Sequence, residues 1–365
     1  MKNYVVTDIS ALQNNALLLK KRLGDMYCVV KCNAYGHGNT ECVSALREVG
    51  MTRFAVFSFE EAVRIKAAAR DAEILILGRS AEDLTDAICH YGFVQTVASP
   101  EYASVLSNAP VCPKIHIKLD TGMNRSGFKN APEVVISAFQ GIENSIVGAY
   151  THFPNADKSD FSDTEARFTR FSACAHAIQE HLKRPLTLHA AASAAALHKD
   201  ATALPRLNAC RIGLALYGIK PAECAPDVSL TPVMSFYADV SEVRTVNAGE
   251  RIGYGGRTVC AKASQIATVP AGYANGLTRA LFGRFKPLLN GYRVPFAGNI
   301  CMDRCMLDVT EIFERGGSVK TGDTVVFFDK THPVTLMSDA IGTIDYEVLT
   351  SVGNLSMDKY YNFSL

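Results

Sequence analysis

Three basic residues stand in or just after apolar runs of the sequence. Lys31 closes the run Tyr27–Lys31, Lys118 lies within the run Lys114–Leu119, and Arg125 follows in a loop bounded by glycines. Burial in an apolar site favours the neutral amine of a lysine, the form that attacks a carbonyl carbon. An arginine binds a carboxylate through two parallel hydrogen bonds. Together these residues suit Schiff-base chemistry on a carboxylate-bearing substrate. Taken alone, Lys31 better suits a solvated loop, and Lys118 a pairing with an acid.

Polar residues also follow three later apolar runs. His152 could stack on a flat ring or relay protons, although a structural histidine fits as well. Ser193 follows the next run, where capping a helix is the simpler role. Arg211 is followed by Gly213 and Leu214, whose amides could hold a phosphate together with the Ser193 hydroxyl. Each signal is weak alone, and only their agreement carries weight.

The last third of the chain places tyrosines between glycines. Tyr254 lies in IGYGG and Tyr273 in GYANG, a setting that most often marks a turn. A phenol acts as a base only where a nearby cation favours its anion. The same region supplies four further candidates, which are Cys301, Met302, Asp303 and Tyr346.

Short β-branched runs alternate with helical patterns over the first two-thirds of the chain, and these elements must position the candidate residues. Apolar spacing of three and four residues predicts helices between the runs, for example over Pro132–Phe139 and Thr164–Leu182. Eight strands, most followed by a helix, predict an α/β fold, a parallel (β/α)8 TIM barrel with catalytic groups at the carboxyl ends of its strands. Strand count and length disfavour the alternative, an open doubly wound sheet. The predicted strands are Tyr27–Lys31, Phe54–Ser58, Ile74–Leu77, Val94–Val97, Lys114–Leu119, Ile146–Thr151, Leu186–His189 and Asn208–Ile212.

The pattern changes near residue 230. From there strand-like runs follow one another without long helices, and turn residues such as Asn247-Ala248-Gly249 separate them. The preceding stretch, Pro226–Pro232, has the composition of a linker. We therefore expect a barrel domain over residues 1–229 and a mainly β domain over residues 230–365. The predicted strands of the second domain are Ser235–Val246, Ser264–Val269, Arg293–Phe296, Cys305–Val309 and Thr324–Phe328.

The composition disfavours several classes of partner. With 365 residues, 48% of them hydrophobic and 20% charged, the chain is typical of a two-domain globular protein. A formal net charge of +1 offers no electrostatic attraction for nucleic acid or an anionic membrane. The beginning, MKNYVVTDIS, lacks the apolar core of a signal peptide, and no run of 18 apolar residues occurs. The eleven cysteines lack zinc-site spacing, so we expect no metal and a reduced, cytoplasmic protein.

Eight motifs along the chain together resemble the alanine racemase family. They are KCNAYGHG, LDTGMNRSG, THF, ACRIGLALYG, IGYGG, GYANG, CMDRCM and DYEVL, in this order between residues 31 and 349. Members of this family are pyridoxal-phosphate enzymes with a barrel domain and a β domain. Because eight spaced motifs agree over nearly the whole chain, the resemblance is specific.

The resemblance implies a two-base racemase. Lys31 would carry the cofactor, pyridoxal 5′-phosphate, as a Schiff base and serve one face of the substrate, whereas Tyr254 of the partner subunit would serve the other. The family forms head-to-tail homodimers with composite active sites. Arg211 would bond the pyridine nitrogen and disfavour its protonation, and His152 would lie over the ring and link Arg211 to Tyr254. The residues implied to bind the phosphate are Tyr35, Ser193, Gly213, Leu214 and Tyr346.

The resemblance also implies a site for the substrate carboxylate, formed by Arg125 and the amide of Met302. In many members the lysine at the position of Lys118 is carbamylated and orients the arginine, which we take as a hypothesis for this chain. The supporting positions are Cys301, Asp303 and Tyr273.

Three residues depart from the family pattern and leave the substrate open. They are Ala192, Asn275 and Asn299, where the family commonly has asparagine, aspartate and arginine. The expected reaction is conversion of L-alanine to D-alanine for bacterial cell-wall precursors, and the alternative substrate is serine or a broader set of small amino acids. A related decarboxylase would need an acid where this chain has Arg211. A non-enzymatic carrier of the cofactor would consist of a barrel alone.

Overall fold

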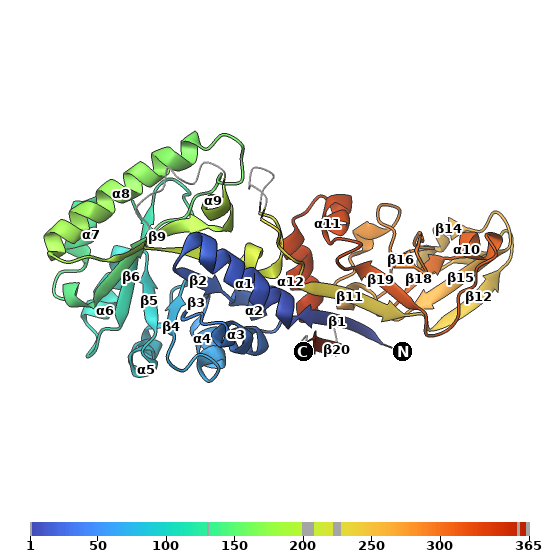
Figure 1. Ribbon diagram of the computed structural model, residues 1–365, viewed down its shortest axis with the longest axis horizontal. Helices are drawn as coiled ribbons and strands as arrows, with labels where there is room; N and C mark the ends of the chain where they lie inside the picture. Colours follow the sequence, from blue (N-terminus) through green and yellow to red (C-terminus); the bar gives the residue numbers. More distant parts are fainter. Residues whose placement is uncertain (1, 130, 199–207, 222–227, 356–357, 363–365) are drawn as a thin grey trace. The chain divides into compact units, whose positions relative to one another are not determined.

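The computed structural model describes residues 2–129, 131–198, 208–221, 228–355 and 358–362 (Figure 1). Contacts between residues divide the chain into two compact units. The barrel unit comprises Leu12–Ala34 and Asn39–Leu230. The β-rich unit comprises the described residues up to Ala11, the short segment Tyr35–Gly38, and the chain from Thr231 onward.

The barrel unit is built on eight parallel strands in the described part of the chain. Neighbouring strands pair in the order β5-β4-β3-β2-β10-β9-β8-β6, and the pairing of β5 with β6 closes the ring. The predicted TIM barrel is therefore confirmed, together with the β-rich second part. The strands are β2 (Met26–Val29), β3 (Arg53–Val56), β4 (Glu73–Ile76), β5 (Val94–Val97), β6 (Lys114–Asp120), β8 (Ile146–Tyr150), β9 (Thr187–Ala192) and β10 (Ala209–Ile212), with the short β7 (Phe128–Lys129) beside β6.

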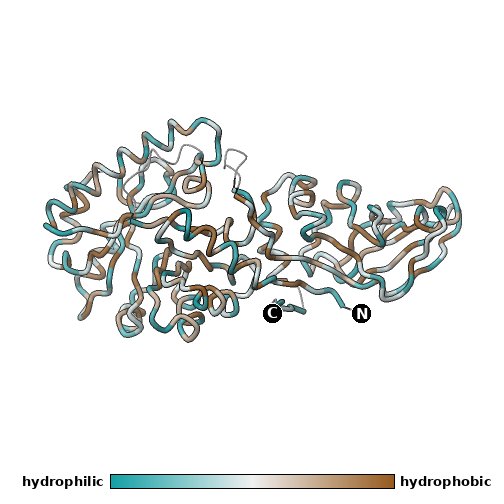
Figure 2. The backbone as a smooth tube through the Cα atoms, in the orientation of Figure 1, coloured by the Kyte–Doolittle hydropathy of each residue, from teal (hydrophilic) through white to brown (hydrophobic). Residues whose placement is uncertain are grey.

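Burial explains why the strands of the barrel could be predicted from the sequence. Strands β2, β5 and β10 are buried at every position, as expected for a parallel sheet that is covered on both faces. The helices instead alternate hydrophobic and hydrophilic positions, which Figure 2 shows along α8. The helices of this region are α1 (Ile9–Leu23), α3 (Asn39–Glu48), α4 (Phe59–Lys66), α5 (Thr85–Tyr91), α6 (Pro100–Ser107), α7 (Pro132–Ala138), α8 (Ser162–Leu182) and α9 (Ser193–Leu197).

The β-rich unit contains three sheets among its described residues. The largest has the strand order β17-β16-β19-β11-β1-β20, and the others are β12-β15-β18 and β13-β14. Their bounds are β1 (Asn3–Asp8), β11 (Met234–Asp239), β12 (Glu242–Val246), β13 (Arg251–Ile252), β14 (Thr258–Val259), β15 (Ser264–Val269), β16 (Leu288–Leu289), β17 (Tyr292–Arg293), β18 (Cys305–Asp308), β19 (Thr324–Phe328) and β20 (Asp358–Asn362). The helices are α10 (Thr310–Glu314), α11 (Thr335–Ile341) and α12 (Asp345–Leu355).

Three features of this unit differ from the sequence expectations. The run Ser235–Val246 forms two strands, β11 and β12, which belong to different sheets. Helices α11 and α12 occupy a stretch in which no helix was expected. Strand β1 pairs with β11 and β20, although its position in the sequence suggested the barrel domain. These pairings join segments more than 200 residues apart, so local periodicity does not reveal them.

Within the described residues, no helix combines the length and the apolar character needed to cross a membrane.

Candidate active site

Consecutive strands of the barrel bring candidate residues to one end of the ring. The order β6-β8-β9-β10-β2 places these strands side by side, and all are parallel. Their carboxyl ends therefore lie at the same mouth. Lys31 follows β2, His152 follows β8, Ser193 follows β9, and Arg125 follows β6.

Lys31 begins an unusual backbone turn. Strand β2 ends at Val29, so Lys31 is not the last residue of a strand, as the sequence suggested, but the first residue of this turn. The next four residues have positive φ angles, which are 53° at Cys32, 57° at Asn33 and 54° at both Ala34 and Tyr35. Each non-glycine residue in this conformation costs about 1–2 kcal/mol. Such strain persists only where surrounding contacts impose it, and it clusters at functional sites.

Glu61 supplies two of the contacts that hold this turn. Its carboxylate accepts hydrogen bonds from the amide of Cys32 at 2.6 Å and from the amide of Phe57 at 2.7 Å. Glu61 is the third residue of α4, where its own amide donates to the hydroxyl of the N-cap residue Ser58. In an ordinary capping box this glutamate would return to the N-cap amide. Here it instead ties the start of α4 to the residue that follows Lys31.

Arg211 is buried at 5% exposure and donates all of its observed hydrogen bonds inside the barrel. One terminal nitrogen donates to the carbonyl of His189 at 2.8 Å, and the other to the carbonyls of Thr151 and Ala190 at 2.7 and 3.0 Å. Burial lowers the pKa of Arg211 to about 10, so the guanidinium stays charged at neutral pH. Its Nε forms no hydrogen bond among the described residues, and this donor is available to a ligand.

Two histidines, His152 and His189, contact Arg211, and a third, His116, contacts His189. Burial is the largest cause that lowers the pKa of each. The value falls to about 3 for His152 and His116, and His189 is also well below the ordinary range, with the Arg211 charge acting in the same direction. All three are therefore neutral at pH 7. Arg211 donates to Nδ1 of His152 at 3.2 Å and to Nδ1 of His189 at 2.9 Å, so both rings carry their proton on Nε2. His189 then donates to Nδ1 of His116 at 2.8 Å.

Ser193 does not cap a helix, contrary to the simpler interpretation of the sequence. It is the first residue of α9, and Ala192 occupies the N-cap position without a side-chain hydrogen bond. The Ser193 hydroxyl accepts from the amides of Gly213 and Ala215 at 3.3 and 3.4 Å. The structure thus brings Ser193 together with the start of the Leu214–Tyr217 turn that follows β10. Within the described residues the Leu214 amide has no hydrogen-bond partner.

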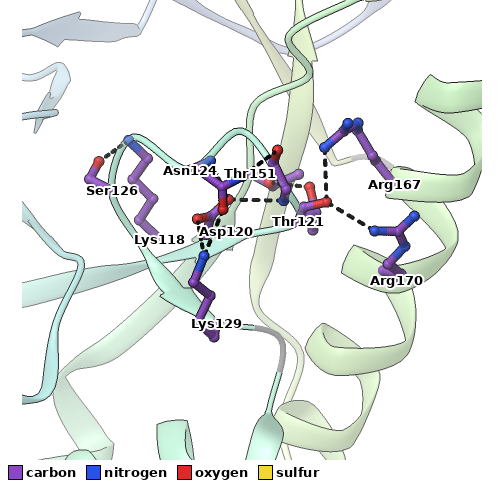
Figure 3. Close-up of polar contacts among 10 residues, drawn as sticks. Lys118, Asp120, Thr121, Asn124, Ser126, Lys129, Thr151, Arg167 and Arg170 are labelled. Atoms are coloured by element: carbon purple, nitrogen blue, oxygen red, sulfur yellow. Dashed lines mark hydrogen bonds and ion pairs between the residues drawn. The ribbon is translucent and has the colours of Figure 1, made fainter.

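Lys118 is buried in β6, and its amine donates to the hydroxyl of Ser126 at 2.6 Å (Figure 3). Burial is the main cause that lowers the pKa of Lys118 to about 8, and the charges of Arg125 and Arg211 act in the same direction. A substantial fraction of this amine is therefore neutral near pH 8. Arg125 lies exposed in the loop between β6 and β7.

The β-rich unit holds the second group of candidates. Tyr254 begins a tight turn, Tyr254–Gly256, and its side chain is 78% exposed. Gly253 and Gly255 flank it with φ angles of 67° and 75°, a conformation that glycine adopts without strain. The side-chain Nδ2 of Asn299, a residue that departs from the family pattern, donates to the backbone carbonyl of Tyr254 at 2.9 Å.

A second turn of this unit joins Tyr273 to Cys301 and Met302. The amide of Tyr273 donates to the carbonyl of Cys301 at 3.0 Å, and the amide of Ala274 to the carbonyl of Met302 at 2.9 Å. Gly272 is required here, because a Cβ atom at this position would clash with both carbonyl oxygens. The thiol of Cys301 contacts the carbonyl of Asn299, so this turn is continuous with the Tyr254 turn. Asp303 forms an exposed ion pair with Arg304.

Tyr35 and Tyr346 are connected through helix α12. Tyr346 lies in the first turn of this helix. Gly36, which follows Tyr35, approaches the helix so closely that a Cβ atom there would stand 2.7 Å from the carbonyl oxygen of Leu349. The close approach of Gly36 to Gly353 of the same helix fixes the position at which Tyr35 leaves its strained turn.

Sequence reasoning missed four residues around the barrel mouth. His116 and Asp120 lie two residues on either side of Lys118 in β6, so strand alternation places all three on the same face, which is the signal that could have found them. His189 ends a predicted strand and was given no role. Glu61 had no local signal for its role, because its contact with Cys32 crosses 29 positions in the sequence.

The barrel is closed, and its polar residues gather at the carboxyl ends of its strands. This arrangement is typical of a barrel enzyme. Residues 7–221 match the family model described as "Alanine racemase, N-terminal domain", and residues 233–360 match "Alanine racemase, C-terminal domain". The chain belongs to the alanine racemase family.

Individual relatives agree with this assignment. Alanine racemase 1 of Clostridium acetobutylicum is 35% identical over 337 residues, which cover 89% of this chain and 86% of the relative. The crystal structure of alanine racemase from E. faecalis is 30% identical, with a TM-score of 0.88 and coverage of 99% and 98% of the two chains. The structure from Bartonella henselae, described with covalently bound pyridoxal phosphate, is 25% identical, with a TM-score of 0.88 and coverage of 99% and 100%.

Replacement of Glu61 tests whether its carboxylate holds the turn that begins at Lys31. We expect Glu61→Ala to lower kcat by about 10- to 100-fold, because small displacements of a catalytic group have effects of this size. Hydrogen exchange of the Cys32 amide should accelerate as well, since its acceptor is lost. Glu60→Ala, in the same first turn of α4, is the matched control. Equal kcat and equal exchange in the two variants would contradict the assignment.

Proposed function

We propose that this chain interconverts L- and D-alanine by a two-base mechanism that depends on pyridoxal 5′-phosphate. The observation that carries the proposal is the convergence of Lys31, Arg211 and Ser193 on the adjacent strands β9, β10 and β2, in a member of the alanine racemase family. The D-alanine formed would supply bacterial cell-wall precursors. The expected cytoplasmic location stays a prediction.

The donor set at the barrel mouth fits the proposed cofactor. Lys31 offers an amine for the aldehyde, Arg211 offers its unpaired Nε to the ring nitrogen, and Ser193 with the Leu214 amide offers donors to the phosphate. When bound, pyridoxal phosphate supplies an electron sink that acidifies the α-hydrogen of the substrate. The covalent cofactor described for the Bartonella henselae relative supports this assignment. Tyr35, Gly213 and Tyr346 complete the proposed phosphate site.

Arg211 would hold the ring nitrogen in its unprotonated form. An arginine donates hydrogen bonds and cannot accept them, and its pKa of about 10 keeps it charged at neutral pH. The neutral His152 accepts from Arg211 through Nδ1 and carries its proton on Nε2. An unprotonated ring withdraws electrons less strongly, which favours return of the proton over side reactions such as transamination.

Racemisation needs one base on each face of the substrate α-carbon. We assign one face to Lys31 and the other to the partner subunit's Tyr254 in a head-to-tail homodimer. The 78% exposure of the Tyr254 side chain supports a role at a surface that another copy covers. Asn299 holds the backbone of the tyrosine turn through a neutral amide. Tyr273, Cys301 and Asp303 would support this side of the site.

The substrate carboxylate would bind to Arg125 and to the amide of Met302. The Met302 carbonyl is paired with the amide of Ala274, whereas its own amide has no partner in the described part of the chain. Serine carries the same carboxylate and amine, so a serine or broader-specificity racemase is the second candidate. Ala192, Asn275 and Asn299 depart from the family pattern, and these departures are the reason for the second candidate. Rates measured with alanine, serine and larger amino acids distinguish the two.

Lys31→Ala tests the cofactor assignment. We expect the variant to lose the visible absorbance of the cofactor-bound protein and nearly all conversion of L-alanine to D-alanine, because the amine that anchors the cofactor is gone. Lys21→Ala, an exposed lysine of α1, is the control. Unchanged absorbance in Lys31→Ala would refute the assignment, and release of carbon dioxide from the native enzyme would indicate a decarboxylase.

Tyr254→Phe tests the second base. Racemisation should fall by about 10²- to 10⁴-fold, the usual contribution of a positioned acid–base group. In D2O, exchange of the α-hydrogen should persist for the enantiomer served by Lys31 and disappear for the other, which proton NMR measures directly. Tyr292→Phe serves as the control. Equal, small losses of exchange for both enantiomers would argue against two bases.

Carbamylation of Lys118 is expected because the modification requires a neutral amine. With a pKa of about 8, about a tenth of this amine is neutral at pH 7, and the fraction rises as the pH passes through 8. In 13C-labelled bicarbonate, we expect a carbamate signal that grows over this range and is absent from Lys118→Ala. A native protein with a free ammonium and no signal at pH 8.5 would remove the hypothesis.

A further inference from the structure

The loop that carries Arg125 returns to the strand from which it departs. It leaves β6 after Asp120 and enters β7, and Asp120 pairs with Lys129 in the β6–β7 ladder. The two ends of the loop are therefore neighbours. Gly127 permits this return, because it has a φ of 130° and a Cβ atom there would stand 2.8 Å from the amide nitrogen of Asp120.

The carboxylate of Asp120 fastens the loop from inside. Its Oδ1 accepts from the amides of Gly122 and Asn124 at 2.9 and 3.1 Å, and its Oδ2 lies 3.3 Å from the amine of Lys129 (Figure 3). The same amine donates to Oδ1 of Asn124 at 2.7 Å. Burial alone would raise the pKa of Asp120, but these hydrogen bonds outweigh it and hold the pKa below its ordinary value. The carboxylate is thus an anion at neutral pH.

Helix α8 fastens the first residue of the loop from outside. The carbonyl of Thr121 accepts from Nη1 of Arg167 at 3.1 Å and of Arg170 at 3.4 Å (Figure 3). The hydroxyl of Thr121 also lies 2.9 Å from that of Thr151, the residue that follows β8. Arg167 is itself held by Asp163 of the same helix through a 2.8 Å ion pair.

Arg125 differs from the residues around it. Asn124 on one side is bound through its amide and its side chain, and Ser126 on the other side accepts from Lys118. The Arg125 side chain is exposed and has no partner among the described residues. The loop therefore has a fixed backbone and one free guanidinium, which is the arrangement of a preorganised anion-binding group.

We propose that Asp120 is a positioning residue for substrate binding, whose carboxylate fixes the loop so that Arg125 meets the substrate carboxylate in one orientation. The proposal rests on the proposed role of Arg125. Asp120 acts through the Gly122 and Asn124 amides and touches no reacting atom. Lys129 is secondary, because its side chain is 75% exposed whereas that of Asp120 is 4% exposed, and water screens the ion pair.

The test compares Asp120→Ala and Asp120→Asn in the holoenzyme. We expect Asp120→Ala to raise KM for L-alanine and the inhibition constant of propionate, which has the carboxylate without the amine, by about 10-fold. Asp120→Asn keeps one acceptor oxygen and should have a smaller effect. The absorbance of bound cofactor should not change, and kcat should fall less than KM rises. Lys129→Ala should raise KM less than Asp120→Ala does, and the exposed-carboxylate control Asp83→Asn should change KM by less than about 2-fold.

A double-mutant cycle with Arg125→Ala separates the proposal from the function on which it rests. If Asp120 acts through Arg125, Asp120→Ala should add nothing to KM once Arg125 is absent. If Arg125→Ala leaves KM unchanged, the proposed role of Arg125 is wrong. If Arg125→Ala raises KM but the Asp120 effect is absent or fully additive, the positioning role alone is wrong.

Hydrogen exchange gives a readout that does not depend on activity. The amides of Gly122 and Asn124 should exchange faster in Asp120→Asn than in the native holoenzyme, and Asp83→Asn should match the native protein. Should Asp120→Ala fail to fold, Asp120→Asn carries both measurements. Unchanged exchange together with an unchanged inhibition constant for propionate would overturn the proposal.

Discussion

A buried cation, which has no carboxylate partner among the described residues, holds the interior of the barrel together. Arg211 is satisfied by three backbone carbonyls and by the Nδ1 atoms of His152 and His189. Carbonyl dipoles compensate for the loss of water that a buried charge would otherwise suffer. Because these acceptors come from residues in or next to β8 and β9, the guanidinium ties its own strand, β10, to the adjacent β9 and to β8 beyond it. No carboxylate in the described part of the chain neutralises this charge, so it is available to a ligand.

Burial, and after it the positive charges that include Arg211, set the protonation of the other groups around this cation. Burial and the Arg211 charge together keep His152 and His116 neutral, and they bring the pKa of Lys118 down to about 8. A mouth of this kind favours anions, and both the proposed cofactor and the proposed substrate carry them. The histidines are neutral, and each has a fixed acceptor, Nδ1, and a fixed donor, Nε2. They therefore orient hydrogen bonds without adding charge.

The backbone next to Lys31 and Arg125 is held in place by carboxylates. Two carboxylates, Glu61 and Asp120, each accept two backbone amides, and one amide of each pair belongs to the residue beside Lys31 or Arg125. Glu61 supports the strained turn after Lys31, and Asp120 supports the loop that presents Arg125. In both places a short acidic side chain replaces water as the acceptor, so the loop is ordered before a ligand arrives. The ordering cost of binding is correspondingly smaller.

The sequence by itself determined the barrel, the eight strands and the family, because apolar periodicity and spaced motifs are local properties of the chain. It also placed Lys31, Arg125, His152 and Arg211 near strand ends. Only the tertiary structure decided that β1 joins the sheet of the β-rich unit and that Ser193 accepts amides of the turn after β10 instead of capping a helix. It alone disclosed the left-handed turn at Cys32–Tyr35 and the clamps of Glu61 and Asp120. Those features depend on contacts between atoms that only folding brings together, so the local propensity of the sequence does not predict them.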